Sequence, residues 1–245
     1  MNSRARQRGF SIIEMMVSLG IMSIVMLGAY QLFTEGMQLF RVNQATSDAQ
    51  VAVTKAAGAI STELTNAAPA LTRHYGPTHT HLYGGGGTPG GILPGITFAT
   101  PIDKDGKVRY DSVNGQLYWQ RYISYYFLAD TNGGYDGKIY RGETDVAPEP
   151  GDPEPGNRQV SIIESFLVAN NTNYFANNGA VKRRMIAEGI SGLCVQPYNP
   201  SEDFGPGVTA AKTAYDVFIE AGDKAQSFRN SYFICVRVRV SPGAR

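Results

Sequence analysis

This chain of 245 residues has few cysteines, few histidines and almost no net charge. Its two cysteines, Cys194 and Cys235, lie too far apart in sequence for a CxxC redox or zinc motif and are too few for a disulfide-rich scaffold. The 22 Lys and Arg residues nearly balance the 21 Asp and Glu residues, so no overall field draws the protein to nucleic acid or to an anionic surface. The chain can form one internal disulfide at most.

Motifs of catalysis are missing as well. The sequence has no GxSxG, no HExxH and no glycine-rich phosphate loop between a strand and a helix. Its three histidines, His74, His79 and His81, share one glycine-rich stretch that offers no rigid frame for metal ligands or for acid–base chemistry. A membrane-anchored extracytoplasmic enzyme or receptor is therefore only a remote alternative.

A long apolar run near the N-terminus is the most prominent feature that the sequence does have. Residues 10–33 would span about 36 Å as a helix, enough to cross a bilayer. Arg4, Arg6 and Arg8 precede the run and no comparable basic cluster follows it directly, which by the positive-inside bias places the N-terminus in the cytoplasm. The run is longer than a secretory h-region and continues as a helical pattern, so we expect it to be retained.

Glu14 is the only charged side chain within this run. A carboxylate at bilayer depth costs about 2.5–3.5 kcal/mol on insertion scales, so it needs a neutralising partner. A cut before Phe10 would create an α-amino group four residues upstream, on the same helical face. In a packed array that amine could serve the Glu14 of an adjacent subunit, which favours a filament. The alternative is an interfacial Glu14 that reaches the lipid headgroups.

The segment Arg8-Gly9-Phe10-Ser11-Ile12-Ile13-Glu14, followed by an unbroken apolar helix, resembles the class III signal of type IV prepilins and type II secretion pseudopilins. The resemblance implies cleavage after Gly9 by a prepilin peptidase, N-methylation of Phe10 by the same enzyme, and a docking role for Glu14. It also implies the partners: other pilins or pseudopilins of one filament, the peptidase, an inner-membrane assembly platform and, before assembly, membrane lipid. No direct nucleic-acid partner is expected.

The rest of the chain predicts an α+β, pilin-like fold in four parts: a leader at 1–9, a transmembrane or filament-core helix at 10–33, an amphipathic continuation at 34–68, and a β-rich globular domain at 69–245. One helix is expected from about 10 to 66, ended by Pro69. Its outer half should lie against a sheet through apolar residues at near-helical spacing, Phe40, Val53, Ala56, Ile60 and Leu64. A coiled coil fits less well because no a/d heptad is sustained.

Strand-like runs in the globular part predict an antiparallel sheet, with long loops at 72–95 and 146–158. The last run alternates valines with Arg237 and Arg239, a pattern in which one face is buried and the arginines form a solvated face. The expected strands are 96–99, 107–110, 116–128, 138–141, 159–168, 192–196 and 232–240.

Two acidic turns offer side-chain oxygens that could bind calcium. One runs from Asp103 to Gly106, and the better one carries Asp130, Asn132 and Asp136. The same residue types are those that ordinary hairpin turns prefer. No cofactor is expected other than this candidate calcium ion.

Cys194 and Cys235 each fall in an expected strand. In an oxidising compartment they could form a disulfide if the two strands are neighbours. The alternative is a pair of buried thiols.

Later segments resemble W-type minor pilins and J-type minor pseudopilins: Ile123–Phe127 leading to Lys138–Arg141, then Ile186–Leu193 and the alternating final strand. This implies a minor pilin that primes or caps a type IV pilus. The alternative is a J-type minor pseudopilin of a type II secretion system or of a DNA-uptake pseudopilus. Either one would sit in the bacterial inner membrane as a single-pass protein, with its C-terminal domain outside the cytoplasm, before it enters the filament.

Overall fold

The computed structural model describes residues 11–76, 91–110, 115, 117–129, 137–146, 160–198, 214–222 and 233–240. At 233–236 it describes the backbone alone. The chain divides into two compact units, Met1–Ala45 and Thr46–Arg245, and the division falls within helix α1, Ile12–Leu64.

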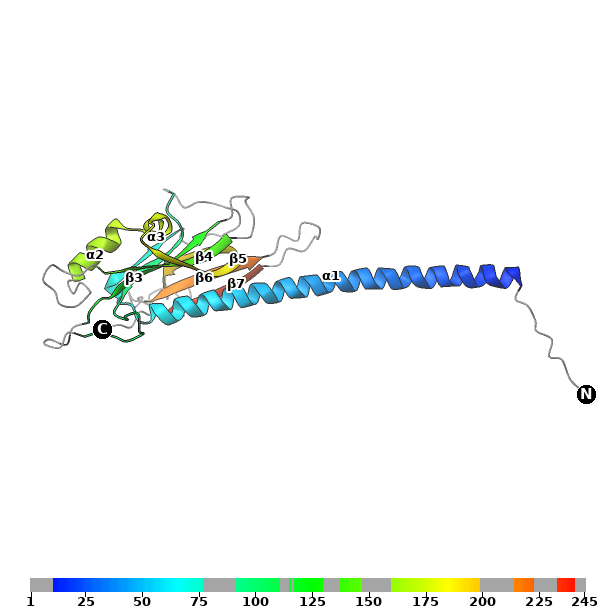
Figure 1. Ribbon diagram of the computed structural model, residues 1–245, viewed down its shortest axis with the longest axis horizontal. Coiled ribbons are helices and arrows are strands. Elements are labelled where there is room, and N and C mark those ends of the chain that lie inside the picture. The colour runs from blue at the N-terminus through cyan, green and yellow to red at the C-terminus, as the bar shows by residue number, and fades with distance from the viewer. Residues whose placement is uncertain are drawn as a thin grey trace, which may run out of the picture. The chain divides into compact units, whose positions relative to one another are not determined.

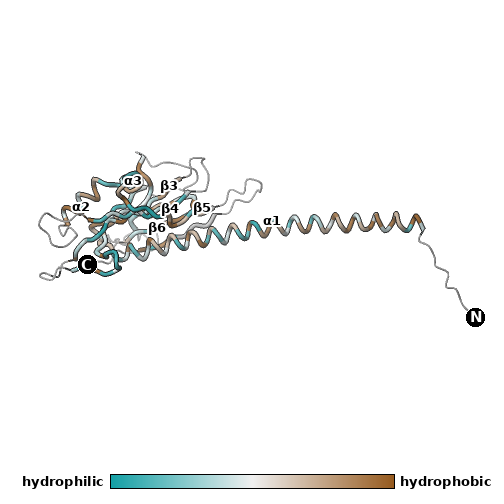
Figure 2. Tube along the Cα trace, in the orientation of Figure 1, coloured by the Kyte–Doolittle hydropathy of each residue, from teal (hydrophilic) through white to brown (hydrophobic). Residues whose placement is uncertain are grey.

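Helix α1 is continuous over 53 residues because no proline occurs before Pro69. Every side chain from residue 11 to residue 33 is exposed, and Figure 2 shows the apolar character of this part of the helix. A turn follows Leu64, and the 3₁₀ helix η1, Pro69–Leu71, begins at the expected proline. The helix therefore ends within two residues of the predicted end.

The second unit is built on one antiparallel sheet of seven strands. The strands lie side by side in chain order, from β1 at one edge to β7 at the other, so each described strand pairs with the strand next to it in sequence. Their bounds are β1 Thr72–Tyr75, β2 Gly95–Thr100, β3 Arg121–Leu128, β4 Gly137–Asp145, β5 Lys182–Pro197, β6 Tyr215–Gly222 and β7 Phe233–Val240.

Helices cover both faces of this sheet (Figure 1). The C-terminal part of α1 packs on one face through residues that are buried at helical spacing: Val53, Ala56, Ala57, Ile60 and Leu64. Helices α2, Val160–Ala169, and α3, Thr172–Asn177, cover the other face, where Ile163, Leu167 and Phe175 pack on Tyr122 and Tyr126. The expected α+β architecture, a long N-terminal helix followed by an antiparallel sheet domain, is confirmed.

Four of the five residues expected on the buried face of the helix are buried, but Phe40 is 64% exposed, so its placement there is wrong. The amphipathic pattern begins later along α1 than predicted.

The prediction of a strand at 159–168 is also wrong, because this segment forms α2. Its β-branched residues favour a strand locally. However, Ile163 and Leu167, one helical turn apart, are both fully buried against the sheet, and this packing outweighs the local preference.

Other strands differ from the prediction in extent. Residues 107–110 form only isolated bridges, and β3 begins at Arg121 rather than at 116. Strand β5 is 16 residues long where five were expected, while β1 occupies the start of the expected loop 72–95. Strand β6 and helix α3 were not predicted. Of the expected loops 72–95 and 146–158, residues 77–90 and 147–158 lie outside the described residues.

Candidate assembly site

The N-terminal turn of α1 carries the first group of functional candidates. Gly9 and Phe10 lie outside the described residues, whereas Glu14 is described. The Ser11 backbone N–H donates to Glu14 Oε2 at 3.1 Å, and the Ile13 N–H donates to the Ser11 hydroxyl at 3.3 Å. Side chain and backbone thus exchange hydrogen bonds in the manner of a capping box, in which a residue at the third helical position returns to the cap. Glu14 therefore closes the end of its own helix.

The sequence contained the signal for this cap, since Ser-x-x-Glu before an apolar run is the usual pattern. The charge of Glu14 within an apolar run predicts only that it needs a partner, and the cap gives it a second role. A capping carboxylate also interacts favourably with the positive end of the helix dipole. Its interaction with the helix terminus reduces the cost of placing it at bilayer depth, and its charge stays available to a further cation.

The apolar part of α1 is exposed throughout. In the part of the chain that the structure describes, α1 is the one helix long and apolar enough to cross a membrane. The hydroxyl of Ser23 donates to the Leu19 carbonyl at 2.8 Å, so this polar side chain is satisfied within the helix. Such a surface needs lipid or neighbouring helices to cover it.

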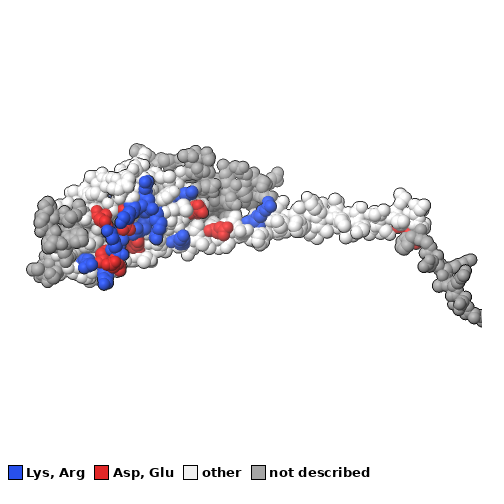
Figure 3. Space-filling model, viewed as in Figure 1, with Lys and Arg blue, Asp and Glu red and all other residues white. Residues whose placement is uncertain are grey.

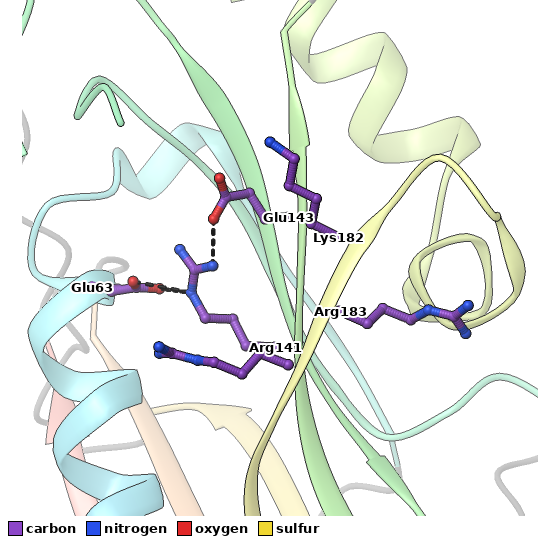
Figure 4. Close-up of a pocket in the computed structure, with 6 residues that line it drawn as sticks. Glu63, Arg141, Glu143, Lys182 and Arg183 are labelled. Carbon is purple, nitrogen blue, oxygen red and sulfur yellow. Dashed lines mark hydrogen bonds and ion pairs between the residues drawn. The ribbon is translucent and has the colours of Figure 1, made fainter. Parts of the chain in front are cut away.

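A charged network joins the C-terminal end of α1 to the sheet, and sequence reasoning missed it. Arg141 of β4 lies between two carboxylates, donating to Glu63 of α1 at 2.9 Å and to Glu143 of its own strand (Figure 4). Arg121 of β3 donates to Glu143 at 3.1 Å, and the Tyr125 hydroxyl donates to Glu63 at 2.8 Å. Each carboxylate thus accepts from two partners.

The side chains of Arg121, Arg141 and Glu143 are each less than 15% exposed, so these charges are paired in a largely buried site. Burial acts to raise the pKa of Glu143, but hydrogen bonds from Arg141 and Arg121 outweigh it and hold the pKa below its ordinary value. Burial likewise opposes the charge of Arg141, and the two carboxylates override it and raise the pKa. For Tyr125, burial and then the neighbouring Glu63 both raise the pKa of the hydroxyl.

The carboxylate of Asp103 accepts hydrogen bonds from its own turn. Asp103 Oδ1 accepts from the N–H groups of Asp105 and Lys107, each at 2.9 Å, and Oδ2 accepts from Arg109 Nε at 2.8 Å. These bonds from Lys107 and Arg109 lower the pKa of Asp103. The carboxylate therefore stabilises the turn, and calcium binding by this turn stays a prediction. The second candidate, with Asp130, Asn132 and Asp136, lies outside the described residues and stays a prediction.

Strand order bears on the predicted disulfide. Cys194 lies on β5 opposite Phe218 of β6, and Cys235 lies on β7 opposite Glu220 of β6. Because β6 runs between them, two strand spacings of together about 9.6 Å separate the two backbones. Disulfides require Cα atoms about 4.4–6.8 Å apart. The two strands are not neighbours, and this order argues against a disulfide between Cys194 and Cys235. The disulfide stays a prediction.

The alternating pattern of β7 predicts that its arginines form a solvated face, and both are exposed but also make specific contacts. Arg237 and Arg239 pair with the buried carboxylate of Asp216 on β6, the latter at 3.1 Å. The Arg239 guanidinium also lies 3.5 Å from the ring centre of Tyr198. The two arginines are about one-third exposed and serve to neutralise a buried acid.

Comparison with protein families identifies the N-terminal segment. Residues 4–30 match the family described as the prokaryotic N-terminal methylation motif. This match supports a type IV pilin-like precursor. The match covers the basic leader, Gly9, Phe10 and the first part of α1, which is the stretch that carries the resemblance noted from the sequence. Neither the comparison with curated proteins nor that with solved structures finds a match for the chain.

The pilin-like motif and the fold agree with each other. A class III signal followed by a long apolar helix supports membrane anchoring, and the helix then continues into an antiparallel sheet domain, as in the pilin-like architecture. A motif of this kind is typical of precursors that a prepilin peptidase processes and that associate with other pilins.

Proposed function

We propose that the chain is a minor type IV pilin-like subunit, processed by prepilin peptidase after Gly9 and methylated at Phe10. The observation that carries the proposal is a methylation motif at residues 4–30 running directly into an exposed apolar helix. After processing, that helix passes from lipid into the core of a filament, where the helices of neighbouring subunits cover it. The globular unit then lies on the extracytoplasmic side, as the basic leader predicts.

The subunit is structural in this proposal and has no catalytic role. A minor subunit that primes or caps a pilus agrees with the resemblance of the later segments to W-type minor pilins. The second candidate is a J-type minor pseudopilin of a type II secretion system or of a DNA-uptake pseudopilus, which would share the same N-terminal chemistry. An enzyme or receptor on an anchor is a distant third because the sequence lacks a catalytic motif.

Mass spectrometry of the mature protein tests the proposal. Purified from cells with a working prepilin peptidase, the protein should begin with N-methyl-phenylalanine at Phe10. In cells without the peptidase, the full leader should remain. An intact Met1 terminus in the presence of the peptidase would exclude the pilin-like function, whereas recovery of the processed chain from sheared filaments or from a secretion complex would distinguish the two machines.

A further inference from the structure

A hollow of about 410 Å³ opens beside the charged network at the end of α1. All of the described residues that line it are charged: Glu63 and Glu143 contribute carboxylates, and Arg141, Lys182 and Arg184 contribute cations. Arg183 also lines it, but its guanidinium donates to the Ala176 carbonyl. Figure 3 shows Lys and Arg side chains gathered in a band on this side of the globular unit, with acidic groups beside them. The hollow therefore carries a surplus of positive charge.

Glu63 and Glu143 cannot neutralise this positive charge because each already accepts hydrogen bonds from other side chains. Glu63 accepts from Arg141 and Tyr125, and Glu143 accepts from Arg141 and Arg121. The side chains of Lys182 and Arg184 are exposed and have no ion-pair or hydrogen-bond partner within the part of the chain that the structure describes.

Strand register fixes these two cations on the side of the sheet that α1 covers. Arg184 is paired across the strands with Arg141, and Lys182 with Glu143. Residues directly opposite in an antiparallel pair share one face, so Arg184 lies beside Arg141. The charge of Arg141 is already matched by Glu63 and Glu143, and Arg184 adds a further cation beside it. Arg183 has the opposite orientation, and its guanidinium donates to the Ala176 carbonyl beyond the sheet (Figure 4).

We propose that Lys182 and Arg184, with Arg141 at their base, form a docking surface for an Asp- or Glu-bearing segment of a neighbouring subunit. This inference rests on the proposed function, which supplies the neighbouring subunit. A carboxylate on that segment can accept a forked pair of hydrogen bonds from Arg184 and a further one from Lys182. Clusters of basic side chains of this kind recognise acidic segments in other proteins.

The lining favours a protein carboxylate over other anions. Single-stranded nucleic acid calls for aromatic stacking platforms, and none of the described residues that line the hollow is aromatic. A duplex calls for a run of cations along its phosphates, which Glu63 and Glu143 would interrupt. Small-molecule sites have mainly apolar walls with a few polar groups, whereas here the walls are charged throughout.

Binding of labelled hexaglutamate to the full-length protein in detergent, at low ionic strength, tests this surface. We expect Lys182→Gln with Arg184→Gln to weaken binding about tenfold, since two charge-assisted contacts are lost. Each single substitution should give an intermediate loss of about threefold. Arg183→Gln is the matched control, because it removes the same charge from the same tripeptide on the other side of the sheet, and it should bind as the unaltered protein does.

Undiminished hexaglutamate binding by the double variant would overturn the proposal, and so would an equal loss of binding with Arg183→Gln. A third contrary result would be that the binding of a short DNA duplex or of inorganic phosphate falls more than hexaglutamate binding when the two cations are removed. In cells, the double variant should carry the normal processed N-terminus yet be recovered poorly from filaments. If the unaltered protein itself is not processed, the proposed function fails, and the hexaglutamate measurement still decides whether the hollow binds carboxylates.

Discussion

Glu14 shows how one side chain can serve two interactions at the scale of a residue. Its carboxylate accepts from the Ser11 N–H in the isolated chain, which completes the first turn of α1. The proposed cut before Phe10 would place an amine beside the same carboxylate. The capping bond uses one oxygen of a charged group that can accept several hydrogen bonds, so capping and charge pairing are compatible.

Substitutions at this turn separate the two roles. Glu14→Gln keeps a side-chain acceptor for the cap but removes the charge, whereas Ser11→Ala removes the hydroxyl cap and keeps the charge. We expect both variants to be processed, Glu14→Gln to be nearly absent from filaments, and Ser11→Ala to be reduced only modestly, since an N-cap is worth about 0.5–2 kcal/mol. Immunoblots of sheared filaments against total membranes measure this. Normal incorporation of Glu14→Gln would show that capping is the whole role of Glu14.

The backbones of β2 and β3 approach each other so closely at Gly95 that a side chain does not fit there. A Cβ atom added to Gly95 would lie 2.1 Å from the carbonyl oxygen of Tyr125. The obstacle is backbone rather than a flexible side chain, so the two strands would have to move apart. A glycine is required here by the pairing of the sheet and not by a turn.

We therefore expect Gly95→Ala to destabilise the globular unit by about 1–3 kcal/mol, the usual cost of overpacking. Urea unfolding of the full-length protein in detergent, followed by circular dichroism, measures the change. Gly179→Ala is the matched control, because an added Cβ there meets nothing within 4 Å, and it should leave stability within about 0.5 kcal/mol of the starting value. Equal midpoints for the two variants would contradict the close approach.

At the element scale, the local sequence pattern predicted the secondary structure correctly where one face of an element is buried. It predicted the wrong element where packing outweighs a local preference. The spacing of Val53, Ala56 and Ile60 identified the outer half of α1 correctly. The β-branched residues of 160–169 suggested a strand, yet the segment is a helix that lies on the sheet. That choice depends on Tyr122 and Tyr126, which are distant in sequence.

The ion pairs around Arg141 bear on the stability of the whole globular unit, since they tie α1 to β3 and β4. The pKa of Glu143 is depressed in the folded state, so its contribution to stability is present above the unfolded pKa of 4.5 and is lost as pH falls through the folded value. We expect the free energy of unfolding to fall as pH decreases below 4.5.

Glu143→Gln should flatten this pH dependence, because the substituted side chain does not titrate. The measurement is the difference between the urea unfolding free energies of the two proteins at neutral pH and at acid pH. That difference should be largest at neutral pH and shrink in acid. A difference that stays constant with pH would mean that the charge of Glu143 is not what stabilises the unit.

The sequence by itself determined the processing motif, the membrane-length helix, its amphipathic continuation and the antiparallel character of the domain. These follow from composition and from periodicity over a few turns, which act between near neighbours. Only the tertiary structure decided that Glu63 meets Arg141, that β6 separates Cys194 from Cys235, and that Lys182 and Arg184 share one face while Arg183 takes the other. Such choices are set by strand order, register and burial between distant segments, which no local pattern contains.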